Sequence, residues 1–257
     1  MDAYKKYFSE FLGTFILIFV GSGAVCANYL LTKAGQPGLG LLGIALSYGF
    51  AVVAIVYALS YISGTHINPA TTISFWVTKR IDGGTALMYI LFQLAGAASA
   101  GFLIKTMFPE AIAINFGAFS PAPGVSSIQA ILMEALLSFL LVFTVYATVV
   151  DKRAAGALAG LAIGLVVVFD VVVGATVSGG AVTPSIAFGP AIASGNFANH
   201  QVYWIGHCLG AIVAGLVYDL VFAEKEVVDE ELLRMHEEIA KASKGEAAKP
   251  RRGRAKA

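Results

Sequence analysis

Long apolar runs separated by short polar stretches dominate the first 223 residues of the chain. Six of these runs reach the roughly 20 residues that a helix needs to cross the hydrocarbon core of a bilayer. They predict membrane-spanning helices over residues 7–31, 41–62, 84–107, 127–150, 155–174 and 199–223. Two shorter apolar runs, at about 69–78 and 184–194, each begin at a proline, which suits the first turn of a helix. These two runs are too short to cross, so they predict half-helices.

The half-helices constrain the rest of the fold. Backbone that leaves helical form inside hydrocarbon finds no water for its amide and carbonyl groups, so it is tolerated only where protein buries it or where it lines a water-filled cavity. Two re-entrant half-helices therefore imply a lumen. The fold class that follows is an all-α membrane protein with six transmembrane helices and two half-helices.

The apolar region also contains a weak internal repeat, with one copy at about 1–107 and the other at about 127–223. Three pairs of segments match in the same order: SEFLGTF (9–15) with MEALLSF (133–139), SGTHINPA (63–70) with SGGAVTPS (178–185), and QLAGA (93–97) with HCLGA (207–211). Each copy has three spans, so the second copy enters the membrane from the opposite side and the repeat is inverted. Inversion brings the half-helix N-termini, Pro69 and Pro184, together near the midplane, where both positive dipole ends face the lumen.

Charge adds the orientation. Only 13% of residues are charged and the net charge is +1, so nothing favours a nucleic-acid partner. Apart from Lys33 and Lys105, the basic residues fall on one side of the six spans, which predicts cytoplasmic termini in a multi-pass protein of the cell membrane. From Glu224 onward the chain is highly charged, so 224–257 is predicted to be a solvated cytoplasmic tail, with a short amphipathic surface helix as the alternative.

The sequence resembles the major intrinsic protein family, the aquaporins and aquaglyceroporins, over about residues 1–223. SGTHINPATTISFW is the most specific element, and SEFLGTF, YWIGHCLGA and AFGPAIA support it. The resemblance implies an aquaporin-like homotetramer in which each protomer has its own pore for water or small uncharged solutes. It also implies no cofactor and no enzymatic step. No metal site is expected either, because His66 has no second ligand at a suitable spacing.

The resemblance assigns a pore midpoint. Its expected residues are Asn68, Pro69, Ala70, Thr183, Pro184 and Ser185. In the family, an asparagine at each half-helix donates an amide hydrogen bond to the passing solute, and Asn68 matches that role. Thr183 departs from the pattern, because its hydroxyl both donates and accepts and is shorter than an asparagine amide. The midpoint is therefore expected to be chemically asymmetric, while both helix dipoles still repel cations.

The resemblance also places a narrow external constriction at Tyr48, Val171, Gly180 and Ile186. Ile186 stands where the family commonly has an arginine, and Val171 stands near the position where water-selective members usually have a histidine. The ring therefore has one phenolic hydroxyl and otherwise apolar walls. We expect a wide opening that favours glycerol, urea, ammonia or another small neutral solute, with a weaker barrier to cations than the arginine provides.

Four further polar residues are expected to serve the loops or the pore. The resemblance makes Glu10 and Glu134, which are related by the repeat, buried acceptors that hold the two re-entrant loops. Asp170 is costly inside a span. It is expected to accept hydrogen bonds from the second loop or to lie near the membrane surface, and contact with the solute is the alternative. His66 is expected to pack in the first loop or to line the pore.

Three alternatives to a passive channel remain open. Inverted repeats, broken helices and Asp170 are also features of proton-coupled secondary transporters. A non-conducting member of the family with a scaffolding role would have a closed pore, and its tail would be the functional part. A pore that leaks ions would follow from Ile186 in place of arginine.

Overall fold

The computed structural model describes residues 3–154 and 156–224 of the chain. The chain divides into two units, Met1–Phe222 and Ala223–Ala257. Apart from Glu224 itself, the predicted tail, including the alternative of an amphipathic helix, lies outside the described residues.

Among the described residues, six helices are long and apolar enough to cross a membrane, which confirms the predicted spans. They are α1 (Ala3–Lys33), α2 (Gly40–Ser63), α4 (Gly83–Met107), α5 (Ser127–Val145), α6 (Ala159–Gly174) and α8 (His200–Val217). A π-helical turn extends α5 over Tyr146–Val150 and another extends α8 over Tyr218–Phe222. A short 3-10 turn, Gly156–Leu158, precedes α6.

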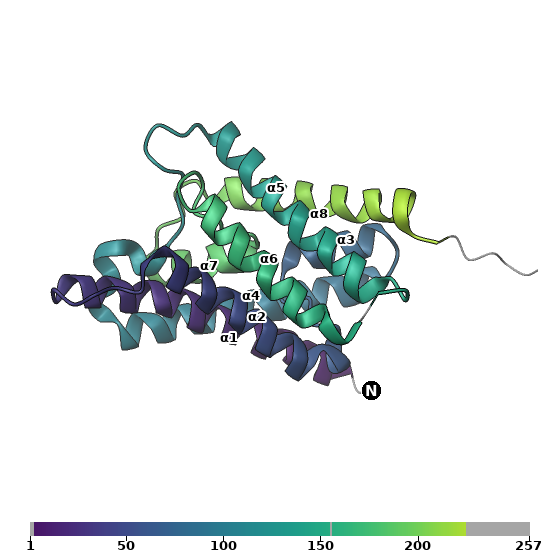
Figure 1. Ribbon diagram of the computed structural model, residues 1–257. Helices are drawn as coiled ribbons and strands as arrows, with labels where there is room; N and C mark the ends of the chain where they lie inside the picture. The colour runs from purple at the N-terminus through teal and green to yellow at the C-terminus, as the bar shows by residue number, and fades with distance from the viewer. Residues whose placement is uncertain (1–2, 155, 225–257) are drawn as a thin grey trace, which may run out of the picture. The chain divides into compact units, whose positions relative to one another are not determined.

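The two short helices are α3 (Pro69–Val77) and α7 (Pro184–Ser194). With 9 and 11 residues they are about 14 and 17 Å long, roughly half the thickness of the hydrocarbon core. In Figure 1, α3 lies toward the end of the bundle where α1 begins, and α7 lies toward the opposite end. This placement is the one that re-entry from two opposite sides requires.

One element was not predicted. A 3-10 segment, η1 (Pro109–Gly117), joins the two halves of the chain and packs against α1 and α7. Asn115 and Phe116 in it have left-handed backbone angles, with φ of 51° and 54°, and the Phe116 side chain is buried.

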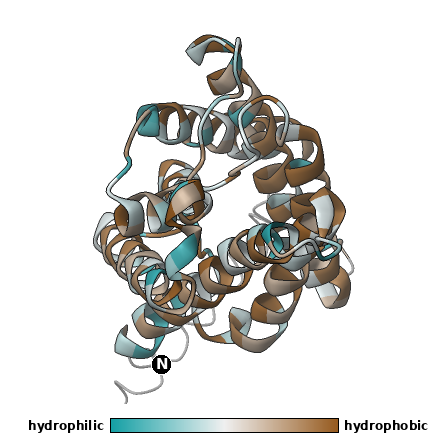
Figure 2. Ribbon diagram, turned by 90° about the vertical axis from the view of Figure 1, so that its left-hand side faces the viewer, coloured by the Kyte–Doolittle hydropathy of each residue, from teal (hydrophilic) through white to brown (hydrophobic). Residues whose placement is uncertain are grey.

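The halves of the chain exchange contacts through the half-helices. α3 packs mainly against α8 of the second half, and α7 packs mainly against α4 of the first half. Seen end-on in Figure 2, the helices form a ring with hydrophobic residues over most of its outside. Small residues let neighbouring helices approach closely. A Cβ added to Gly210 of α8, for example, would lie 1.9 Å from the carbonyl oxygen of Ala135 on α5.

Candidate transport pathway

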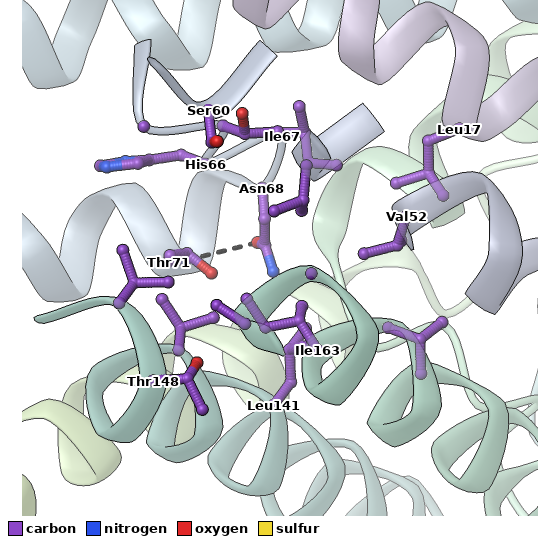
Figure 3. Close-up of a pocket in the computed structure, with 18 of the residues that line it drawn as sticks. Leu17, Val52, Ser60, His66, Ile67, Asn68, Thr71, Leu141, Thr148 and Ile163 are labelled. Carbon is purple, nitrogen blue, oxygen red and sulfur yellow. Dashed lines mark hydrogen bonds between the residues drawn. The ribbon is translucent and has the colours of Figure 1, made fainter. Parts of the chain in front are cut away.

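Two cavities lie inside the ring of helices. The first cavity has a volume of about 360 Å³ and contains both half-helix caps, Asn68 and Thr183, in its wall (Figure 3). The second cavity, of about 450 Å³, lies among α1, α2, α6 and the segment after η1. The rest of the first cavity is largely aliphatic, with Leu17, Val52, Val56, Leu141, Ile163 and Val167 among its lining residues.

Asn68 presents a hydrogen-bond donor to the first cavity. Its side-chain oxygen caps α3 by accepting from the backbone N–H groups of Ala70 at 2.8 Å and Thr71 at 3.4 Å. Its amide nitrogen is buried and has no partner among the described residues. In Figure 3 this nitrogen points toward the wall that Leu141 and Ile163 form. The cap therefore fixes the side chain so that its N–H₂ group is available to a solute.

Thr183 caps α7 by a weaker version of the same contact. Its hydroxyl oxygen accepts from the Ser185 backbone N–H at 3.3 Å, which leaves the hydroxyl hydrogen free to donate. The other predicted midpoint residues, Pro69, Ala70, Pro184 and Ser185, are buried in the first turns of the half-helices and line neither cavity. They set the direction of the half-helices, while Asn68 and Thr183 face the cavity.

Glu10 of α1 holds the first re-entrant loop, which joins α2 to α3. Its Oε1 accepts from the hydroxyl of Ser63 at 2.6 Å and from the backbone N–H of His66 at 3.0 Å. Its Oε2 accepts from the backbone N–H of Ile67 at 2.6 Å and from the amide of Gln93 at 2.8 Å. The glutamate is completely buried, so these donors replace all of its water.

Glu134 of α5 does the same for the second re-entrant loop, which joins α6 to α7. It accepts from the backbone N–H groups of Ala181 at 3.0 Å and Val182 at 2.9 Å. Its third partner is the imidazole Nε2 of His207, at 2.7 Å. Sequence reasoning gave His207 no role. The only signal in the sequence was its position opposite Gln93 in the repeat.

The glutamates stabilise an unusual backbone conformation. Ile67 has φ of 41° and Val182 has φ of 63°, which is the left-handed region that β-branched residues avoid. The backbone N–H of Ile67 donates a hydrogen bond to Glu10, and that of Val182 donates one to Glu134. Such strain, of order 1–3 kcal/mol, persists only where the surroundings over-determine the conformation. The loop geometry therefore depends directly on these carboxylates.

Three of the four predicted constriction residues line one of the two cavities. Tyr48 and Val171 line the second cavity, and Ile186 lines the first. Gly180 lines neither, because its backbone is pressed against α6, where an added Cβ would lie 2.9 Å from the carbonyl oxygen of Asp170. A constriction at these residues stays a prediction, with Val171 in the wall of the second cavity and Ile186 in the wall of the first.

The Tyr48 hydroxyl is already engaged. It makes a hydrogen bond of 3.0 Å with the hydroxyl of Ser22 on α1. The ring lies so close to α1 that a Cβ on Gly21 would be 1.9 Å from it. The phenol therefore forms a fixed wall of the second cavity.

His66 and Asp170 differ in their relation to the pathway. His66 lines the first cavity, and its Nδ1 is 3.1 Å from the hydroxyl of Thr72. Asp170 is 1% exposed and lines neither cavity. Among the described residues, the loop N–H groups of Ala181 and Val182 donate to Glu134 and not to Asp170, which is buried. The expected position of Asp170 near the membrane surface stays a prediction.

A ring of six helices around two half-helices whose caps share one cavity defines a membrane channel of the aquaporin type. The family model described as "Major intrinsic protein" matches residues 1–218, and the chain belongs to this family. Members of the family are passive channels for water or small solutes, and that is the general function of this multi-pass protein.

Individual relatives support the same assignment. The chain is 39% identical over 221 residues to aquaporin TIP2-1 of Arabidopsis thaliana, covering 85% of this chain and 87% of that protein. It is 37% identical over 241 residues to aquaporin AqpM of Methanothermobacter marburgensis, covering 86% and 98%. Its fold is similar to the X-ray structure of the aquaglyceroporin from Plasmodium falciparum, with a TM-score of 0.76 at 24% identity, covering 86% of this chain and 98% of that chain.

Proposed function

We propose that the protein conducts small uncharged solutes of about the size of glycerol, together with water, through a wide and mostly apolar constriction. The proposal rests on the chemistry of the side chains predicted for the constriction and on the cavities that three of them line. Val171, Gly180 and Ile186 contribute no charge and no side-chain hydrogen-bond donor there. The only polar group expected in the ring, the Tyr48 hydroxyl, is paired with Ser22.

A pathway with apolar walls favours small solutes that have some apolar surface of their own. A water molecule that passes an apolar ring gives up hydrogen bonds without replacement, at a cost of roughly 2 kcal/mol or more for each polar group left unpaired. A polyol or an amide loses less, because its apolar surface contacts the aliphatic wall of the first cavity. Asn68 and Thr183 then provide two fixed partners for its polar groups.

We also propose a homotetramer in the cell membrane with both termini in the cytoplasm. The family resemblance supports the tetramer, and the distribution of basic residues supports the orientation. Contacts between the basic loops and the end of α8 agree with it. Arg80 pairs with Asp219 at 2.5 Å, and Arg153 donates to the carbonyl oxygen of Phe222 at 2.7 Å. These contacts bring the basic loops and the end of α8 to one side.

The test is stopped-flow light scattering on proteoliposomes with gradients of water, glycerol, urea and ammonia. We expect glycerol permeability well above that of protein-free vesicles. The variant Ile186→Arg should restore a cationic constriction and reduce glycerol flux more than water flux. Ile186→Leu, which keeps volume and polarity, is the matched control. Equal loss of water and glycerol flux in Ile186→Arg would contradict the proposed constriction.

The same vesicles separate the passive channel from its alternatives. A proton-coupled transporter would lose transport when an uncoupler collapses the proton gradient, whereas a channel follows the solute gradient alone. Burial of Asp170 away from both cavities favours the channel. Conductance in planar bilayers identifies an ion leak. Vesicles with no added permeability to any of the four solutes would indicate a non-conducting member.

A further inference from the structure

Each re-entrant loop is supported by an equivalent hydrogen bond from a tyrosine. Tyr89 donates to the carbonyl oxygen of Ser63 at 2.8 Å, and Tyr203 donates to that of Ser178 at 2.8 Å. Four residues after each tyrosine comes the side chain that bonds the buried glutamate. Because the contacts are equivalent, residues of the second repeat can be compared with those at the same positions of the first.

At two positions the second repeat replaces a neutral side chain by one that can ionise. Gln93 bonds Glu10, whereas His207 bonds Glu134. Eight residues before the serine of each loop, the first repeat has Ile55 and the second has Asp170. A glutamine cannot take up a proton in the physiological range, but an imidazole can.

All three ionisable groups at this end of the second loop are buried, and Glu134 and His207 are hydrogen-bonded to each other. Glu134 and His207 are completely buried, and Asp170 is 1% exposed. Asp170 packs against the same loop: a Cβ added to Gly180, the residue before Ala181, would lie 2.9 Å from the Asp170 carbonyl oxygen. Glu134 also acts electrostatically on the Asp170 carboxyl group. Within the described residues, neither Oδ2 of Asp170 nor Nδ1 of His207 has a hydrogen-bond partner. Two carboxyl groups and one imidazole are thus buried near the second loop, and Oδ2 of Asp170 and Nδ1 of His207 remain able to accept a proton.

We propose that His207 and Asp170 are positioning residues that bind a proton together with Glu134, and that this proton controls the geometry of the second re-entrant loop and thereby the flux through the channel. The first loop, held by Glu10 and the neutral Gln93, keeps its geometry over the same pH range. The inference rests on the proposed place of the second loop in the transport pathway.

The proton acts on the loop through Glu134. Charge-assisted hydrogen bonds are roughly twice as strong as neutral ones. A proton bound by these groups either neutralises Glu134 or pairs it with a cationic His207, and in both cases the bonds to Ala181 and Val182 weaken. Val182 then relaxes from its left-handed conformation, and Thr183 next to it moves. Flux therefore falls as the pH falls.

Other titratable groups around these three residues come from α8. They are Tyr203, on which Glu134 acts, and His200, on which His207 acts. The second loop and α7 carry no titratable side chain between Ala175 and Ser194. His66 belongs to the first loop and lines the first cavity, so it is the competing source of pH dependence.

The experiment measures water permeability of proteoliposomes between about pH 7.5 and pH 5, the range in which an imidazole titrates. Water is the probe because the channel family, and not the proposed selectivity, predicts its passage. We expect the wild-type flux to fall about threefold at the lower pH, as loss of charge assistance from one hydrogen bond would cause. The variants His207→Gln and Asp170→Ile, which copy the first repeat, should each reduce the dependence, and the double variant should abolish it. His66→Gln should retain it.

Two outcomes would overturn the inference: a flat wild-type profile, or a profile that survives in the double variant. Gel filtration and flux at pH 7.5 establish that each variant is folded. Infrared difference spectroscopy adds a readout that does not depend on flux. A carboxyl band, or an imidazolium band if His207 takes the proton, should appear on acidification of the wild type and be absent from the double variant, and its persistence there would place the proton elsewhere.

Discussion

Replacing Glu10 by glutamine tests how the re-entrant loops are held. The substitution keeps the shape of the side chain and exchanges one acceptor oxygen for an NH₂ group. Glu10 now accepts four hydrogen bonds, two at each oxygen. Ser63 and Gln93 can turn to offer an oxygen to the new NH₂ group. The backbone N–H groups of His66 and Ile67 cannot, so one of them loses its acceptor in either orientation of the amide.

The size of the effect follows from this count. One buried N–H without a partner costs about 1–3 kcal/mol, and each remaining bond that loses its charge assistance costs up to about 1 kcal/mol more. The variant should therefore be less stable than the wild type by at least about 2 kcal/mol. For a chain of this size that loss lowers the unfolding midpoint by roughly 4–8 °C.

The assay is thermal unfolding of the detergent-solubilised protein, followed by circular dichroism at pH 7. Glu110→Gln is the matched control, because Glu110 is exposed and pairs with the exposed Lys33 at 2.7 Å. A surface pair of this kind contributes little to stability, so the control should unfold near the wild type. If Glu10→Gln and Glu110→Gln had the same midpoint, the idea that a carboxylate with four donors fixes the first loop would be refuted.

Three further predictions concern the constriction, the helix packing and the loop that follows α5. Ile186→Arg should lower the ratio of glycerol to water permeability in proteoliposomes, and an unchanged ratio would argue against a position in the constriction. Gly210→Ala places a Cβ 1.9 Å from the carbonyl oxygen of Ala135, so α5 and α8 must separate, at a cost of about 1–3 kcal/mol in an unfolding measurement. Hydrogen bonds from Arg153 hold the pKa of the Asp151 carboxyl well below its usual range. This contact therefore stabilises the fold above the unfolded-state pKa of about 4, and the stabilisation is lost as the pH falls through the lower folded-state pKa. Asp151→Asn should therefore make the unfolding midpoint less dependent on pH between about pH 5 and pH 2.

The starts of the half-helices could be predicted to the residue because their signals are local. A proline fixes the first turn, and the residue before it, Asn68 or Thr183, caps the helix through its own side chain. The six spans were predictable for a similar reason, since length and apolar composition alone satisfy the bilayer. The predicted and observed starts of α5 and of both half-helices coincide.

The parts that could not be predicted depend on contacts between distant residues. η1 has left-handed residues that are stabilised by burial of Phe116, and no local pattern announces such burial. His207 bonds Glu134 across 73 positions of sequence. The burial of Asp170 away from both cavities was not predicted either, because it depends on how α6 packs against its neighbours.

The two repeats differ in a way that separates folding from transport. Their shared contacts, from each glutamate and each tyrosine, all satisfy backbone groups of a re-entrant loop. Hydrocarbon provides no other hydrogen-bond partners for these backbone groups, so the loops need the contacts whichever solute the channel conducts. The differences lie at the cavity, where Asn68 is replaced by Thr183, and behind the loop, where Gln93 is replaced by His207. Because these changes leave the backbone bonds in place, the second repeat can alter solute contact and proton response without the loss of the fold. Exchanging Thr183 and His207 for their first-repeat counterparts should therefore change permeability more than stability.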